Sequence, residues 1–92
     1  MNDAMKLARI FKILSVDTRL RIIQLLKDRA LCVGALSAQI GISQGAVSQH
    51  LRVLRDADLV VAERRGYYIH YRLNEEVLAQ WWKDVTEKLL GM

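Results

Sequence analysis

Three side chains in this sequence could bind a soft metal or act as nucleophiles: Cys32, His50 and His70. Zinc requires three or four ligands in a tetrahedral arrangement, and two scattered histidines do not supply them. The single cysteine is typical of a reducing compartment. Near a helix N-terminus the Cys32 thiol would react with an oxidant or a soft metal bridging two chains, although burial as a small hydrophobe is the commoner role. We therefore assign no metal site and keep Cys32 as a candidate sensing residue.

The sequence lacks the residue constellations of an enzyme. It contains no carboxylate pair, no nucleophile beside a base and no phosphate-binding loop. Gly41 and Gly45 flank a helix cap and do not form a glycine-rich cradle. We expect neither catalysis nor a bound cofactor.

A second group of polar side chains could form hydrogen bonds with base edges. Apolar residues recur over roughly residues 44–57 as on one face of a helix: Val47, Leu51 and Leu54. The opposite face carries small and polar residues: Gln44, Gly45, Ser48, Gln49 and Arg52. Gln can pair with adenine, Gly45 lets the backbone come close, and Arg52 fits a phosphate. The alternative is a solvated face, but Glu and Lys, which usually fill such a face, are missing between Ser43 and Leu54.

The elements that would position this face form a helix-turn-helix. A helix over about residues 32–40 should end at Gly41, because glycine adopts a positive φ without a Cβ penalty. Ser43 then caps the next helix, and Ile42 can fill the junction between them. Two helices joined by such a short turn predict a helix-turn-helix from Val33 to Leu59, with the second helix entering the major groove of DNA.

A basic hairpin follows the helix-turn-helix. Alternation of Tyr67, Ile69 and Tyr71 with their neighbours, next to Arg64-Arg65-Gly66, predicts two strands joined by a short loop. Two arginines at a hairpin tip fit a wing along the DNA backbone or in the minor groove, and a solvated turn is the alternative.

Three further helices complete the predicted fold. The first buries Ala4, Leu7, Ala8, Phe11 and Leu14. The second is capped by Ser15 or Asp17, buries Leu20, Ile22, Ile23 and Leu26, and ends near Arg29. The last is capped by Asn74. The sequence thus predicts one domain over residues 1–92, mainly α with a small β-hairpin, a winged helix-turn-helix in the order α-α-α-α-β-β-α.

Apolar side chains on the first and last helices exceed what a small core needs. They are Leu7, Phe11, Leu14, Leu78, Trp81, Trp82, Val85 and Leu89. A chain of 92 residues gains stability by burying such surface against a second copy. We expect these residues to form a dimer interface, with packing inside the chain as the alternative.

The charge distribution favours a polyanionic partner. The net charge is +4, and residues 43–72 carry five basic and three acidic groups, whereas residues 73–92 carry two and four. Basic residues on phosphates release counterions, so the chain before the last helix suits DNA better than the last helix does. Neither a signal peptide nor an apolar stretch long enough for a membrane is evident, which predicts a soluble, cytoplasmic protein.

Two stretches make the resemblance to a known family specific. Residues 43–55, SQGAVSQHLRVLR, followed by ADLV, resemble the recognition-helix signature of the ArsR/SmtB family. Residues 14–23, LSVDTRLRII, are similar to its second-helix motif, and a wing ending in Tyr71-Arg72-Leu73 also fits. The resemblance implies a homodimer built on the first and last helices that binds an imperfect palindrome in double-stranded DNA and represses transcription until an inducer releases it. The expected DNA contacts are Ser43, Gln44, Gly45, Ser48, Gln49, His50, Arg52, Arg64 and Arg65.

The metal sites of the family are incomplete in this sequence. The thiol site of the arsenic-sensing branch of the family has a Cys-Val-Cys motif on the third helix and another Cys three residues later. The matching positions of this sequence hold Cys32, Val33, Gly34 and Ser37. Soft three-coordinate binding needs sulfur donors that Gly34 and Ser37 lack. A second site of the family uses pairs of Asp and His on the last helix, and residues 74–92 contain no histidine. We expect a repressor of ArsR type with an unknown inducer; the alternatives are a repressor that responds through Cys32 and a winged helix that binds only proteins.

Overall fold

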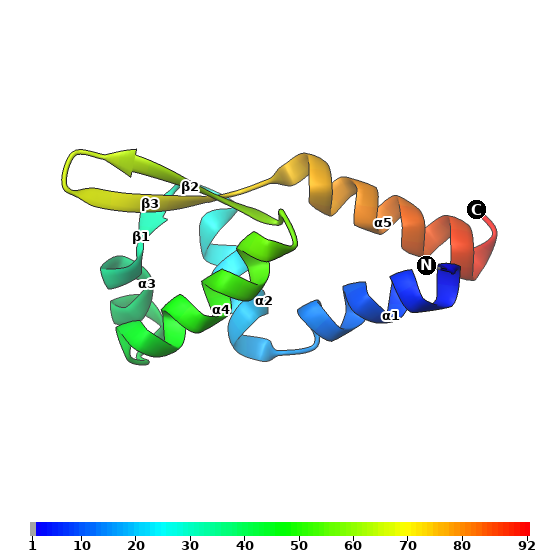
Figure 1. The fold of residues 1–92 in the computed structure, drawn as a ribbon, viewed down its shortest axis with the longest axis horizontal. Helices are drawn as coiled ribbons and strands as arrows, with labels where there is room; N and C mark the ends of the chain where they lie inside the picture. Colours follow the sequence, from blue (N-terminus) through cyan, green and yellow to red (C-terminus); the bar gives the residue numbers. More distant parts are fainter. Residues whose placement is uncertain (1) are drawn as a thin grey trace.

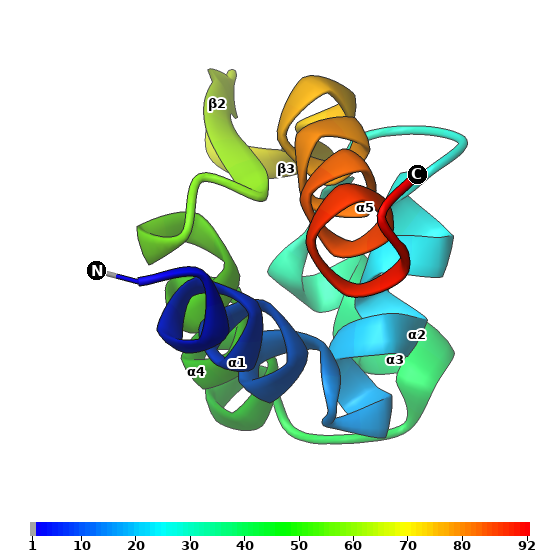
Figure 2. The same ribbon diagram turned by 90° about the vertical axis from the view of Figure 1, so that its right-hand side faces the viewer.

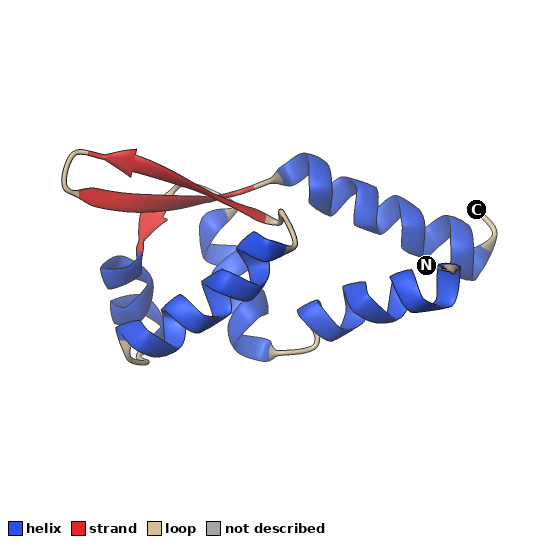
Figure 3. Ribbon diagram, viewed as in Figure 1, coloured by secondary structure: helices blue, strands red, loops and turns tan. Residues whose placement is uncertain are grey.

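Residues 2–92 of the computed structural model fold into five helices and three strands (Figure 1, Figure 3). In chain order the elements are α1 (Asp3–Leu14), α2 (Asp17–Leu26), β1 (Leu31–Cys32), α3 (Val33–Ile40), α4 (Gln44–Asp56), β2 (Val60–Arg65), β3 (Tyr68–Leu73) and α5 (Glu75–Leu90). The predicted mainly α, winged helix-turn-helix fold is confirmed, and β1 is an additional strand.

The turn between α3 and α4 has the predicted geometry. Gly41 ends α3 in the left-handed conformation with φ of 81°, and the Ser43 hydroxyl accepts a hydrogen bond from the Ala46 amide at 3.1 Å. The Ser37 hydroxyl donates to the Ile42 carbonyl, and the Ile42 side chain packs against the core. These contacts set the angle between the two helices of the motif.

The wing belongs to a three-stranded antiparallel sheet of order β1-β3-β2. In the hairpin, Val60 pairs with Leu73 and Arg65 with Tyr68. Gly66 turns the chain with φ of 64°, a conformation that favours glycine. On the other side of β3, the two residues of β1 pair with Tyr71 and His70. The segment expected to begin the third helix at Cys32 therefore joins the sheet first, and α3 begins at Val33.

The described core lies between α2, α3, α4 and the start of the sheet. Its fully buried side chains are Ile22, Val47, Leu36, Leu51, Leu54, Leu59 and Val60. On α2 the prediction for Leu20 is wrong, since 43% of that side chain's surface is exposed. Two boundaries of α2 also differ: Val16 is its N-cap residue, without a side-chain hydrogen bond, and the helix ends at Leu26, before Arg29.

Helices α1 and α5 project from this body and pack against each other; we call the pair the arm (Figure 1, Figure 2). The N-terminal end of α1 and the C-terminal end of α5 lie together at its far end, which makes the molecule 45 Å long and about 22 Å wide. As predicted, Asn74 caps α5, accepting from the Val77 amide at 3.5 Å. No helix within residues 2–92 combines the length and the apolar character that crossing a bilayer requires.

The buried face of α1 differs from the predicted one. Leu7, Ile10 and Ile13 are buried, whereas Ala4 and Ala8 are exposed and 46% of the Phe11 surface is exposed. Helix α1 is apolar on two adjacent sides, and periodicity alone cannot decide which side faces the protein's own core.

Candidate nucleic-acid interface

Helix α4 separates a buried stripe from a polar exposed face. Val47, Leu51 and Leu54 are buried in the core, as predicted. The polar residues expected to meet DNA are exposed together along the other side of the helix and at its start: Ser43, Gln44, Gly45, Ser48, Gln49 and Arg52. Since none of them is acidic, this face can offer hydrogen bonds to base edges and a guanidinium to a phosphate.

His50 is not part of that exposed face. It is half-buried, and its Nδ1 accepts a hydrogen bond from Nε of Arg19 on α2 at 3.3 Å. His50 was expected to contact DNA, but its Nδ1 points toward the junction with α2. His50 follows Val47 by three residues and precedes Leu51 by one, so it lies at the edge of the buried stripe of α4. This position explains the orientation of its ring.

A groove separates α4 from the wing. Its polar lining is Ser48, Arg52, Arg55 and Asp56 of α4 and Tyr71 of β3. Arg55 and Tyr71 were not among the predicted contacts. Arg55 follows Ser48 by seven residues and Arg52 by three, so helical spacing alone could have placed it on the same face. Two guanidinium groups and two hydroxyl groups outnumber the one carboxylate, that of Asp56, so the groove keeps a net positive charge that suits a phosphate.

The wing carries both predicted arginines in exposed positions. Arg64 Nη1 donates to the Gly66 carbonyl at 3.4 Å, and Arg65 Nη2 lies 3.4 Å from a carboxylate oxygen of Glu63. At the tip, Tyr67 is 97% exposed. The guanidinium groups therefore lie at the surface of the hairpin, near an exposed aromatic residue that was not among the expected DNA contacts.

Glu63 lowers the positive charge of the wing. Its carboxylate accepts a hydrogen bond from Nε of Arg72 on the neighbouring strand as well as from Arg65. The Arg72 hydrogen bond is the main reason that the pKa of Glu63 is lower than its ordinary value, with a smaller contribution from Arg65 and with burial acting in the opposite direction. The carboxylate is thus ionised at neutral pH and competes with phosphate for two arginines.

Cys32 lies at the junction of the sheet and α3. It is half-buried, is the N-cap residue of α3, and lines a hollow together with Gln44 and Tyr67–Ile69 of the wing. A Cβ atom placed at Gly34 would lie 3.9 Å from the sulfur of Cys32. Within residues 2–92, no three His, Cys, Asp or Glu side chains come together as a metal site would require.

The outer side of the arm is apolar. Phe11 and Trp82 are exposed, the latter at 70% of its surface, and so is Leu89. A shallow apolar hollow on this side is lined by Ile10, Phe11, Leu14, Leu78, Trp81, Trp82 and Val85. Leu7 differs from the other residues of the expected interface, because it is 6% exposed and already covered by the chain itself.

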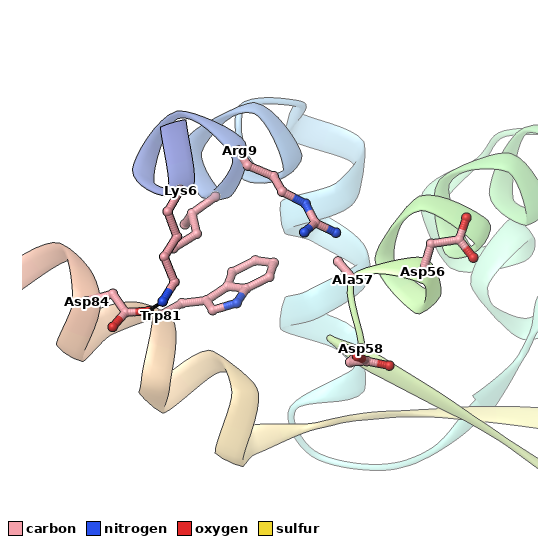
Figure 4. A pocket seen from close by; sticks show the side chains of 8 residues that line it. Lys6, Arg9, Asp56, Ala57, Asp58, Trp81 and Asp84 are labelled. Carbon is pink, nitrogen blue, oxygen red and sulfur yellow. Dashed lines mark ion pairs between the residues drawn. The ribbon is translucent and has the colours of Figure 1, made fainter. Parts of the chain in front are cut away.

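The inner side of the arm is polar. A cavity of about 380 Å³ lies between the arm and the end of α4. In Figure 4 the Trp81 indole lies between Lys6 and Arg9 of α1 and Asp58 of the body. The Lys6 ammonium pairs with Asp84 at 3.8 Å. Trp81 and Ile10 line both this cavity and the apolar hollow, so the two sides of the arm are distinct surfaces that share a thin apolar wall.

Comparison with known proteins identifies relatives of this arrangement. A family described as "Bacterial regulatory protein, arsR family" matches residues 17–61, from the start of α2 to β2. The chain is 36% identical over 69 residues to the transcriptional repressor SdpR of Bacillus subtilis, covering 75% of this chain and 77% of the relative. It is 38% identical over 80 residues to the arsenical resistance operon repressor of Escherichia coli, covering 86% and 68%.

A solved structure extends the likeness to the arm. The homodimeric winged helix-turn-helix DNA-binding domain of Mb0332 from Mycobacterium bovis, described as a possible ArsR-family regulator, superposes with a TM-score of 0.72 at 30% identity. The match covers 89% of this chain and 80% of that one. The shared region therefore includes more than the helix-turn-helix alone.

Proposed function

Because the chain belongs to the arsR family of bacterial regulatory proteins, we propose that it is a homodimeric transcriptional repressor that binds an imperfect palindrome in double-stranded DNA. The observation that carries the proposal is the exposed polar face of α4 over residues 43–52, which has no acidic side chain, beside a basic wing. An enzyme would need a reactive constellation instead, and the family is one of regulators.

Helix α4 would read base edges in the major groove. The amides of Gln44 and Gln49 and the Ser48 hydroxyl can exchange hydrogen bonds with bases, and Gln can form a bidentate pair with adenine. Gly45 has no side chain to hold the backbone away, and a Cβ there would meet only the Ser43 hydroxyl, at 4.0 Å. Arg52, further along the helix, would bind a phosphate and set the register on the duplex.

The wing would add contacts that are less dependent on sequence. Arg64 and Arg65 at the hairpin can follow the backbone or enter a narrow minor groove, where the negative potential is enhanced. The groove between α4 and β3, with Arg55 and Tyr71, offers a further place for a phosphate.

The apolar side of the arm would form the dimer. Phe11, Trp82 and Leu89 are large apolar side chains exposed to solvent, and burying them against a second copy would be favoured by the hydrophobic effect. The homodimeric domain of Mb0332 supports a dimer, and a two-fold axis through the arm would match a palindromic operator.

Repression is the activity named for SdpR and for the Escherichia coli relative. A dimer bound over a promoter would block transcription by occupancy, and such DNA lies in the cytoplasm of a bacterium. The inducer differs from a metal held by the family's complete thiol site, because Gly34 and Ser37 replace two of its donors.

An electrophoretic shift assay on the promoter upstream of the gene for this protein tests the proposal. We expect Gln49→Ala to weaken specific binding by about 1–3 kcal/mol, the range for losing a bidentate base contact. Gln24→Ala, at an exposed position of α2, is the matched control and should bind like the wild type.

The wing is tested with the same DNA at several salt concentrations. The double variant Arg64→Ala, Arg65→Ala should reduce the slope of log affinity against log salt by about 2, close to one per phosphate contact. A wild-type dimer that shifts no DNA while binding a protein partner would contradict the proposal and favour an interaction module.

A further inference from the structure

Arg19 connects the arm to the recognition helix. It lies in the first turn of α2, where it is half-buried. Its Nη1 donates to the carbonyl of Ile13 at the end of α1, at 3.3 Å, and its Nε donates to Nδ1 of His50 on α4, at 3.3 Å. One side chain thus bonds to two elements that are 31 residues and six residues away from it in sequence.

Each of these two contacts satisfies a specific chemical need. The last carbonyls of α1 have no partner within the helix and lie at its negative end, where a guanidinium is favourable. The guanidinium is planar and its donors have a fixed arrangement, so the contact with Ile13 also fixes the direction of Nε. That direction decides where His50, and with it the middle of α4, can sit.

The contact with Arg19 also assigns a role to Nδ1 of His50. Arginine has only donors, so this hydrogen bond requires Nδ1 of His50 to be the acceptor. His50 is therefore bound from the α2 side, away from the groove that faces the wing.

We propose that Arg19 is the positioning residue that fixes the recognition helix relative to the arm. Helix α1 packs on α2 and α5, and α2 packs on α4. Arg19 therefore lies at the junction through which the orientation of the arm is coupled to the orientation of α4. The inference rests on the proposed function: in a dimer joined through the arms, this orientation sets the distance between two recognition helices, which must match half-sites about one helical turn apart.

The experiment compares operators whose half-sites are at native spacing or one base pair closer or further apart. Wild-type protein should strongly prefer the native spacing. We expect Arg19→Gln to bind the native operator about tenfold more weakly, within the range for hydrogen bonds to charged groups, and to lose most of its spacing preference. Arg21→Gln removes the same charge from an exposed position of α2 and should keep the preference.

Two substitutions of His50 distinguish its contact with Arg19 from a contact with DNA. Asn places an acceptor near the position of Nδ1, so His50→Asn should retain the spacing preference. His50→Gln places its amide nearer the position of Nε2 and should lose the preference. Thermal melts and the mass of the dimer are measured for every variant, so that loss of folding is recognised.

Several results would overturn the inference. One is an Arg19→Gln variant that weakens all spacings equally, or no more than Arg21→Gln does. Another is a folded Arg19→Gln dimer with wild-type preference. If the wild-type protein binds no operator, the proposed function fails instead, and nitrogen NMR of His50 still decides the contact: a proton on Nδ1 in the wild type, or an unchanged spectrum in Arg19→Gln, would refute it.

Discussion

Lys6 on α1 and Asp84 on α5 form an ion pair of 3.8 Å across the two helices of the arm. Among residues 2–92, Asp84 is the one charged residue that is buried, with 5% of its surface exposed. Its Oδ1 also accepts from Gln80 Nε2 at 3.1 Å and from Lys88 Nζ at 3.4 Å. The hydrogen bond from Gln80, then the charges of Lys6 and Lys88, keep the pKa of Asp84 below its ordinary value although burial opposes them. The arm is thus joined by a charge that has several partners.

Replacing Asp84 with Asn should destabilise the protein at neutral pH. A depressed pKa means that the carboxylate stabilises the fold above its unfolded-state pKa, near 3.8, and that this contribution disappears as pH falls through the lower folded-state value. Urea denaturation should therefore show a lower midpoint for Asp84→Asn at pH 7 and a smaller difference from wild type below pH 4. Glu87→Gln, at an exposed ion pair with Lys83, should change stability by less than about 0.5 kcal/mol. Equal effects of the two substitutions would show that burial of Asp84 has no special role.

Asp58→Gly should stabilise the protein by up to about 1 kcal/mol, because a Cβ costs roughly 1–2 kcal/mol in the left-handed conformation and the short polar side chain of Asp offsets part of that cost. Asp58 has a φ of 61°, and within residues 2–92 it is the one non-glycine residue with a positive φ. It follows the end of α4, where the Leu59 amide bonds to the Leu54 carbonyl at 2.9 Å, as in a helix that normally ends with glycine. Asp58→Ala should have the opposite sign. A lower denaturation midpoint for the Gly variant would contradict this account.

Trp82→Lys should convert the dimer to a monomer. Trp82 is exposed on the apolar side of the arm, and a lysine in the middle of a proposed interface would have to be buried without a partner. Sedimentation should show that the dissociation constant of the dimer rises at least about 30-fold, the effect of losing a contact worth about 2 kcal/mol. Tyr67→Lys, at the tip of the wing, is the control and should leave the dimer intact. A dimer that survives Trp82→Lys would place the interface elsewhere.

Glu63→Gln should strengthen DNA binding and steepen its dependence on salt. The substitution removes a negative charge from the wing and releases Arg65 and Arg72 from their ion pairs, so both can meet phosphates. Glu87→Gln makes the same change of charge on α5, on the arm, and should have little effect. The comparison is made by fluorescence anisotropy at several salt concentrations. Identical behaviour of the two variants would mean that only net charge matters.

Alkylation of Cys32 with N-ethylmaleimide should weaken DNA binding. The thiol lines the hollow between α3 and the wing, so an added group would press on Tyr67 and Tyr68 and move the wing. Because Cys32 is the one cysteine of the sequence, the reagent is specific, and Cys32→Ser should be indifferent to it. Binding that is unchanged after complete labelling would make Cys32 a packing residue and remove it as a candidate sensor.

The helix-turn-helix was predictable because its signals are local. Gly41 and Ser43 each determine a backbone conformation within a few residues, and the stripe of Val47, Leu51 and Leu54 can pack in one direction only. The hairpin was predictable for the same reason, since alternation and Gly66 are both short-range signals.

Other features depend on partners that are distant in sequence. Strand β1 has two residues and exists because β3 lies beside it, so no periodicity could announce it. Phe11 was assigned to a buried face because α1 is apolar on two adjacent sides, one buried and one exposed. The direction of His50 depends on Arg19, 31 residues earlier, and helical spacing could not choose between α2 and DNA.

The pairing of β1 with β3 has a consequence for the thermodynamics of binding. The wing is a hairpin, and a hairpin attached only at its base would move as a flexible finger that DNA must bring to order. Leu31 and Cys32 hold β3 at its middle, directly before α3 begins, so the wing and the helix-turn-helix move as one body. Two neighbouring grooves can then be contacted without a second loss of conformational entropy, and preorganisation of this kind increases affinity without adding a single contact.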